Sequence, residues 1–176
     1  MTPIAIPAEL LEAIYAHAIA AFPDECCGYL IGRSPALVDG AVACRNAQAD
    51  GEHPVAPARG ADTGFVITGA ELFRFARSFD GDHPARIVYH SHTNGRAYFS
   101  AVDRQVAAVP GWTAGPRGSV TRGGPAYPVQ HVVIGVATGA ASDAGSPAVT
   151  EVAQFAWSAA DGDYVEVARW VPGGRA

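Results

Sequence analysis

Two histidines and an aspartate are spaced in this chain so that they could bind one metal ion. His90-Ser91-His92 is followed, after seven residues, by Ser100-Ala101-Val102-Asp103. The apolar, β-branched run 85–89 predicts a strand that ends at the histidines. Side chains alternate along a strand, so His90 and His92 would point the same way. Two imidazoles, together with one carboxylate that the following loop brings back to them, can provide three ligands of a tetrahedral zinc site. The fourth position then stays open.

The segment that carries Asp103 also has an ordinary structural interpretation. Ser-x-x-Asp among the valines Val102, Val106 and Val109 is typical of a helix start, with Ser100 as N-cap and Asp103 at the third position. The two interpretations are compatible, because a helix beginning there would set the direction of Asp103. A His-x-His pair taken alone is weak evidence for a metal, since histidine is common on surfaces.

A second motif lies upstream, where Glu25 precedes Cys27-Gly28-Tyr29-Leu30-Ile31-Gly32. A glutamate ahead of Cys-Gly-x-Leu-x-Gly, followed by His-x-His-x7-Ser-x-x-Asp, resembles the JAMM (MPN-plus) zinc metalloproteases, most closely their small single-domain bacterial type. The resemblance spans about residues 8–170, and its specific motifs cover 23–32 and 90–103. Order and spacing match at each family position that carries chemistry.

The resemblance implies a role for each of these residues. His90, His92 and Asp103 would hold one catalytic Zn²⁺, and Glu25 would be the general base. Amide hydrolysis at neutral pH needs an activated water, and zinc lowers the pKa of a bound water from about 15.7 to about 7. The Ser100 hydroxyl would donate to the carbonyl oxygen as it gains charge. In that role Ser100 is not expected to be a fully committed N-cap, so Ser100→Ala should cost activity more than stability.

Composition predicts one globular domain over residues 1–176. The chain is 49% hydrophobic and 16% charged, which is typical of a packed core. A net charge of -5 argues against a nucleic-acid surface. The three cysteines form a poor disulfide framework, which favours the cytoplasm. The N-terminal residues predict neither a signal peptide nor a membrane span. Homodimerisation is left open.

Hydrophobic periodicity predicts an α/β fold in a single domain, with a mixed, mostly antiparallel β-sheet flanked by helices. The resemblance implies the same architecture, the MPN fold, which is cytidine-deaminase-like. A capping box at Thr68–Glu71 is expected to open the second helix. The expected helices are 8–22, about 68–79 and 100–109, and the expected strands are 28–33, 36–44, 65–67, 85–89, 131–137, 148–158 and 164–171.

Two long loops, 46–64 and 110–129, are rich in Gly and Pro and are expected to be exposed and to recognise a partner. Thr93 and Phe99 stand where bacterial JAMM proteins often have proline, which puts the stiffness of the connecting loop in question. Asn94, Arg96 and Tyr98 on that loop are candidate substrate contacts. The terminal Gly173-Gly174 is interpreted as part of a frayed tail.

Members of the JAMM family cut peptide or isopeptide bonds after the Gly-Gly tail of ubiquitin or a ubiquitin-like protein. The resemblance therefore implies a ubiquitin-like or sulfur-carrier protein as the substrate. Three alternatives stay open: a non-catalytic MPN scaffold, a nucleobase deaminase and a DNA-repair-associated relative. A deaminase needs His-x-Glu and Pro-Cys-x-x-Cys, and neither occurs in the sequence. The acidic net charge disfavours the DNA-repair alternative.

Overall fold

A single six-stranded sheet organises the computed structural model, which describes residues 1–51, 54, 56–109, 123–139 and 145–173. The strand order is β2-β1-β3-β6-β7-β8. The strands are β1 (Cys27–Ile31), β2 (Gly40–Cys44), β3 (Ala85–His92), β6 (Gln130–Thr138), β7 (Pro147–Ser158) and β8 (Asp163–Trp170). Only β3 and β6 pair in parallel, and the other neighbours are antiparallel. The predicted mixed, mostly antiparallel sheet is confirmed.

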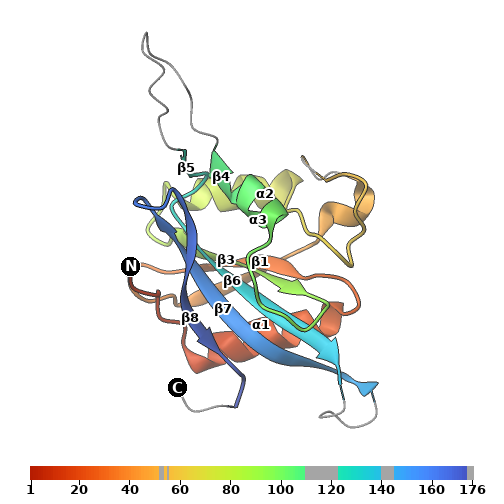
Figure 1. The fold of residues 1–176 in the computed structure, drawn as a ribbon. Helices are drawn as coiled ribbons and strands as arrows, with labels where there is room; N and C mark the ends of the chain where they lie inside the picture. Colours follow the sequence, from red (N-terminus) through yellow and green to blue (C-terminus); the bar gives the residue numbers. More distant parts are fainter. Residues whose placement is uncertain (52–53, 55, 110–122, 140–144, 174–176) are drawn as a thin grey trace.

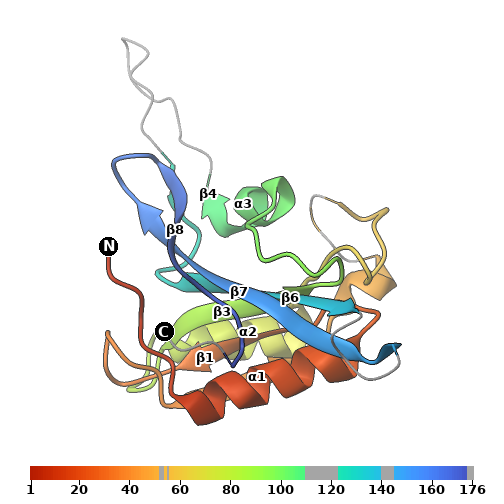
Figure 2. The same cartoon turned by 60° about the horizontal axis from the view of Figure 1, so that its bottom comes forward.

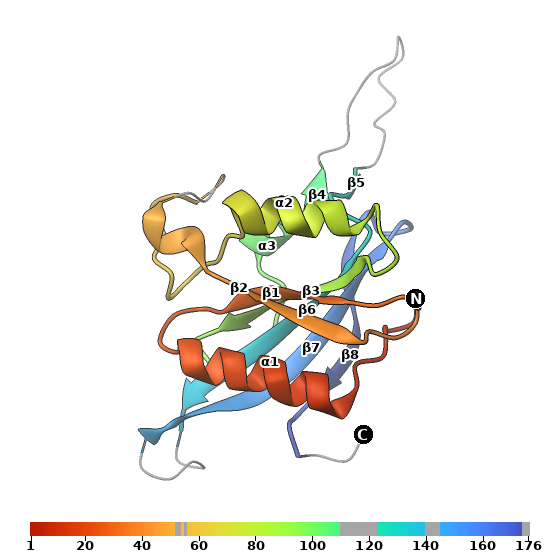
Figure 3. The ribbon, with the colours of Figure 1, turned by 180° about the vertical axis from the view of Figure 1, so that it is seen from behind.

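Helices cover both faces of the sheet (Figure 1). Helix α1 (Ala8–Ala21) lies on one face, while α2 (Gly69–Ser78) and α3 (Ala101–Ala107) lie on the other. Figure 2 shows α1 and α3 on opposite sides of β6 and β7, and Figure 3 shows α2 on the side of β1 and β3 opposite α1. A 3-10 helix, η1 (Ala47–Asp50), and a small pair, β4 (Ala108–Val109) with β5 (Gly124–Pro125), complete the described elements. Among the described residues, no helix has the length and apolar character needed to cross a membrane.

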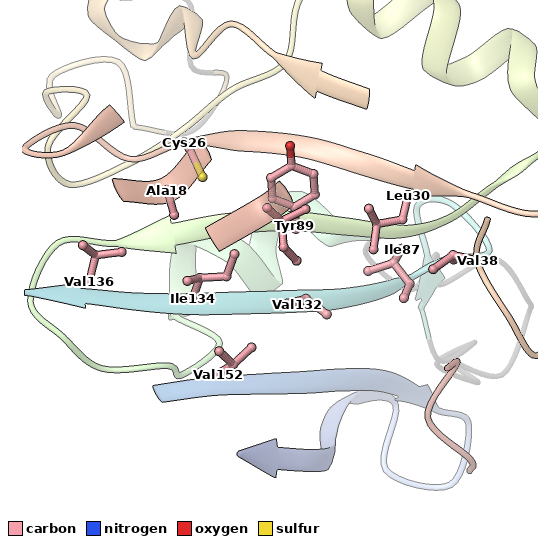
Figure 4. Close-up of a cluster of buried hydrophobic side chains, with 11 residues drawn as sticks. Ala18, Cys26, Leu30, Val38, Ile87, Tyr89, Val132, Ile134, Val136 and Val152 are labelled. Carbon is pink, nitrogen blue, oxygen red and sulfur yellow. The ribbon is translucent and has the colours of Figure 1, made fainter. Parts of the chain in front are cut away.

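The core under α1 is built from alternate residues of the central strands. Ile14 and Ala18 are the buried residues of α1, and they fall four apart, which puts them on one face of the helix. They pack in one cluster with side chains from β1, β3 and β6, including Leu30, Tyr89 and Ile134 (Figure 4). Strand alternation then sends the intervening residues of these strands to the opposite face.

The opposite face carries two apolar clusters, one on each side of the candidate site. Beneath α2, Tyr29, Phe75 and Val88 pack with Val129. A second cluster under α3 contains Phe99, Val133, Phe155 and Tyr164. The ring of His90 stacks on Phe65 at 4.4 Å and is tilted against Phe99 at 6.5 Å between ring centroids. Because Phe65 packs on the first cluster and Phe99 belongs to the second, His90 lies where the two meet.

Several predicted boundaries are wrong. Residues 65–67 form no strand, and the third helix ends at Ala107, because 108–109 leave it to pair with β5. Strand β2 begins at Gly40 and not at residue 36. These segments are short, and tertiary pairing overrides their local propensity.

The capping box predicted for α2 is also wrong. Thr68 is the N-cap residue, but its side chain makes no capping hydrogen bond. The Glu71 carboxylate instead accepts from the backbone N–H of Arg45 at 3.0 Å. Glu71 therefore ties the start of α2 to the residue after β2.

The first predicted loop, 46–64, is only partly exposed. Within it Gln48 is 1% exposed and donates to the carbonyls of Ala56 and Arg59. The second predicted loop, 110–129, falls largely outside the described residues, and its described end contains β5. The terminal residues 174–176 also lie outside them.

Candidate metal centre

The two histidines and the aspartate of the sequence motif lie together in the structure. His90 Nε2 is 3.3 Å from His92 Nε2, and Asp103 Oδ2 lies 3.4 Å from the first nitrogen and 3.7 Å from the second. Ligand atoms held 2.0–2.1 Å from a tetrahedral ion are separated by roughly 3.3 Å. The three atoms therefore have the spacing of three ligands of one zinc ion, and among the described residues they form a cluster of metal-ligating type.

The ends of β3 and β6 place the two imidazoles. His90 pairs with Val133 and His92 with Gly135 in the parallel ladder, and both rings point to the α2 and α3 side. His92 Nδ1 lies 3.1 Å from the carbonyl oxygen of Arg96. When Nδ1 carries the hydrogen and donates it to this carbonyl, Nε2 keeps a lone pair that can bind a metal. Metal-ligating histidines usually make such a hydrogen bond through the ring nitrogen that does not bind the metal.

The sheet packs closely behind the second histidine. A Cβ on Gly135 would come within 2.6 Å of the backbone of Gly95. A side chain here would push the connecting loop away from the strand. Glycine at this position therefore allows the loop between β3 and α3 to lie against β6.

Ser100 and Asp103 form a complete capping box at the start of α3. The Ser100 N–H donates to Asp103 Oδ2 at 2.7 Å, and the Asp103 N–H donates to Ser100 Oγ at 3.2 Å. The expectation that Ser100 is not a fully committed N-cap is wrong. The hydroxyl accepts the capping bond through an oxygen lone pair, so its own hydrogen stays available for donation.

Backbone hydrogen bonds fix the position of Glu25. Its N–H donates to the carbonyl of Ala61 at 2.8 Å, and its carbonyl accepts from Asn46 Nδ2 at 2.9 Å. Asn46 also donates to Gly64 and accepts from the N–H groups of Gln48 and Val66. One amide side chain thus ties the Glu25 segment to Gly64 and Val66.

The charge states of the site suit a divalent cation. Burial, followed by the nearby charge of Asp103, raises the pKa of Glu25 to about 8. The pKa of His90 is lowered, because burial disfavours the imidazolium more than Asp103 favours it. Burial by itself would raise the pKa of Asp103, but His90 and hydrogen bonds from His92 and Ser100 outweigh it and lower that pKa. Neutral imidazole and carboxylate are the forms that bind metal.

Residues of β7 and β8 clamp the loop that connects β3 to α3. Glu151 accepts from the Ala97 N–H at 2.6 Å, and Arg169 donates to the Ala97 carbonyl at 2.7 Å. The two side chains pair at 2.8 Å. Thr150 also donates to the carbonyl of Gly95, and Thr93 to that of Asp62. These bonds hold the loop that contains Thr93 and Phe99.

A cavity of about 280 Å³ opens beside the cluster. Glu25, His92, Ser100 and Asp103 line it, so the structure brings four of the five predicted site residues to its wall, while His90 lies fully buried next to them. Of the predicted substrate contacts, Asn94 and Tyr98 line the cavity. Arg96 is absent from the lining, and its carbonyl supports His92 instead.

Four residues of the site could not be assigned from the sequence. Asn46, Glu151 and Arg169 position the site through the backbone contacts above, and His131 lines the cavity. His131 lies in a predicted strand, where alternation with the buried Val132 was its one signal. Nothing local marks the other three.

The mixed sheet between helices, with a His-x-His strand end facing a capping aspartate, defines a domain of the JAMM/MPN class. The chain belongs to the family Prok-JAB, the prokaryotic homologs of the JAB domain, which it matches over residues 7–159. It is 32% identical over 108 residues to the CysO-cysteine peptidases of Mycobacterium tuberculosis and Mycobacterium bovis, a match that covers 61% of this chain and 67% of each relative.

A solved structure supports the fold. The solution structure of protein DSY2949 from Desulfitobacterium hafniense resembles this chain with a TM-score of 0.52 and 18% identity, covering 92% of this chain and 87% of that protein. At this identity the likeness concerns the fold alone.

Proposed function

We propose that this protein is a zinc-dependent metallopeptidase that cleaves the peptide or isopeptide bond after the C-terminal Gly-Gly of a ubiquitin-like or sulfur-carrier protein. The observation that carries the proposal is the spacing of three ligand atoms at 3.3–3.7 Å beside a buried glutamate. In this proposal His90, His92 and Asp103 hold one Zn²⁺. When bound there, the ion supplies a water whose pKa is near 7.

Glu25 would move the proton of the reaction. A general base works best when its pKa lies near the operating pH, and burial raises the pKa of Glu25 to about 8 in the protein without metal. The carboxylate would accept a proton from the attacking water and return it to the leaving nitrogen. Its backbone bonds to Ala61 and Asn46 hold the side chain beside the cavity for both transfers.

Ser100 would stabilise the oxygen of the carbonyl under attack. Its Oγ accepts the capping bond of α3 and keeps one hydrogen to donate. Ser100 lines the cavity at the helix start, where the helix positions its hydroxyl. A fixed donor that needs no reorganisation lowers the barrier to the tetrahedral intermediate.

The substrate class rests on relatives. Proteins that match this chain at 32% identity carry the name CysO-cysteine peptidase, which supports a peptidase. A sulfur-carrier protein of the β-grasp type is the substrate we propose, in the cytoplasm. The JAMM resemblance adds the diglycine specificity.

Processing of a carrier protein tests the proposal directly. The zinc-loaded protein is incubated with ubiquitin-like proteins encoded near its gene, each extended beyond Gly-Gly, and their C-termini are measured by mass spectrometry. We expect a product that ends in Gly-Gly with the wild type and none with Glu25→Ala. Identical masses with both proteins across all candidates would leave a non-catalytic scaffold as the better description.

A further inference from the structure

One part of the cavity is not needed for the chemistry described above. This part of the cavity lining, here called the arm, consists of Leu72 and Phe75 from α2, Val102 and Val106 from α3, and Val129 and His131. Leu72 and Val106 are 39% and 41% exposed, whereas Phe75 is 3% exposed. The arm therefore has an open rim and a buried interior.

The charged groups of the cavity lie at its other end. Of the residues that the structure describes, the charged ones in the lining are Glu25, Arg59, Asp62 and Asp103. The last three all act electrostatically on Glu25, which places them around the catalytic end. Among the described residues, the lining of the arm contains no charged side chain, and burial keeps His131 neutral by lowering its pKa to about 3. Burying a charged ligand group without a partner there would be strongly unfavourable.

The cavity is small, and the arm lies near the metal cluster. The whole cavity, about 280 Å³, is just below the range of roughly 300–1,000 Å³ that small-molecule sites occupy. Val102 and Val106 lie one residue before and three residues after Asp103 on α3, rises of about 1.5 Å and 4.5 Å along the helix. An extended substrate covers about 3.3 Å per residue. The arm therefore lies within one or two residues of the bond at the metal cluster.

We propose that this arm binds an uncharged, apolar side chain on the leaving-group side of the cleaved bond, so that the enzyme selects the residue type beyond the diglycine. The inference rests on the proposed function in one respect: two glycines before the cleaved bond have no side chain to fill a neighbouring arm. The side chain that enters the arm therefore belongs to the first or second residue after the cleaved bond. Leucine-sized or aromatic residues fit, and aspartate does not.

A binding experiment tests the arm without requiring cleavage. A β-grasp sulfur-carrier protein ending in Gly-Gly is extended by Leu, by Ala or by Asp, and each form is titrated into zinc-loaded Glu25→Ala protein. We expect the Leu form to bind about tenfold tighter than the Ala form and at least tenfold tighter than the Asp form, a typical discrimination for an apolar pocket. Equal affinities within twofold would overturn the inference.

A matched pair of variants tests whether the arm is the source of the preference. Val106 lines the arm, and Val109, three residues later, is exposed but absent from the lining. Val106→Lys should lower the Leu-to-Asp affinity ratio at least tenfold by offering the aspartate a partner, and Val109→Lys should leave the ratio unchanged. A gain in affinity for the Asp form cannot arise from misfolding. An unchanged ratio in Val106→Lys would overturn the inference.

Cleavage of the same three carriers by the wild type separates the two proposals. If none is cleaved but the binding preference persists, the proposed function fails and the apolar site stands. If all three are cleaved at the same rate and bind equally, the peptidase stands and the selection by the arm is overturned.

Discussion

Ser100 and Asp103 hold each other at the start of α3 through two reciprocal backbone bonds, of 2.7 Å to Asp103 Oδ2 and 3.2 Å to Ser100 Oγ. The same Oδ2 lies 3.4 Å from His90 Nε2 and 3.7 Å from His92 Nε2. The bond that begins the helix therefore also aims the carboxylate at the imidazoles. Local helix stability and the geometry of the candidate metal centre depend on the same atoms.

Replacing Ser100 should lower both stability and activity. Ser100→Ala removes an N-cap, which costs about 1 kcal/mol, and it removes the proposed donor to the carbonyl oxygen, which costs roughly 10²–10³-fold in kcat. Ser158 offers a matched control, because its hydroxyl bonds the N–H and carboxylate of Asp161 three residues later, at the end of β7. Ser158→Ala should lose comparable stability in denaturant melts and keep its kcat. Equal activity losses in the two variants would remove the donor role of Ser100.

Removing the carboxylate charge should abolish metal binding and leave the helix cap in place. Asp103→Asn keeps an oxygen that can accept from the Ser100 N–H but loses the anionic ligand. We expect about one zinc per chain by elemental analysis in the wild type and almost none in the variant. A bound ion stabilises the native state, so a chelator should lower the Tm of the wild type and leave that of Asp103→Asn unchanged. A chelator-insensitive Tm in both proteins would count against a metal at this cluster.

Glu25 should make the metal-free protein less stable at alkaline pH. Its folded pKa, about 8, lies above the ordinary value of 4.5, so the folded state binds a proton that the unfolded state has released. The stabilisation is complete below pH 4.5 and is lost as the pH rises toward 8. Over this range the loss is on the order of a few kcal/mol. Glu25→Gln should flatten the decline in metal-free protein and lower kcat about 10²–10⁴-fold. Parallel pH profiles of wild type and variant would contradict the assignment.

The Glu151–Arg169 pair should control metal affinity from a distance. Both side chains hold the backbone of Ala97, and Glu166 pairs with the same arginine at 2.7 Å from within β8. Glu151→Gln should raise the zinc dissociation constant about tenfold, because losing a group that supports the ligands typically weakens metal binding by about this factor. The variant should also speed hydrogen exchange at the Ala97 amide. Glu166→Gln is the control and should change neither. Equal effects of the two variants would indicate general destabilisation of β8.

The features of the site that depend on local spacing could be predicted from the sequence. His90 and His92 share a face because a strand alternates with period two, and Ser100 begins a helix because Ser-x-x-Asp satisfies the first free N–H groups. The pairs of strands β1–β2 and β7–β8 and the helix α1 were also predicted from the sequence, because their hydrophobic periodicity extends over enough residues. The roles of these residues in catalysis stay predictions.

The tertiary structure decided the contacts between residues far apart in the chain. Thr68 and Glu71 have the pattern of a capping box, yet the Glu71 carboxylate accepts from the backbone N–H of Arg45, 26 residues earlier in the chain. Asn46 supports Glu25, and Arg169 supports a loop 72 residues away. No local pattern predicts such contacts. The sequence by itself determined which side chains could bind a metal; only the packing of α3, β6 and β8 around them determined that three ligand atoms lie within 3.7 Å of one another, since that proximity comes from burial and backbone pairing across the whole sheet.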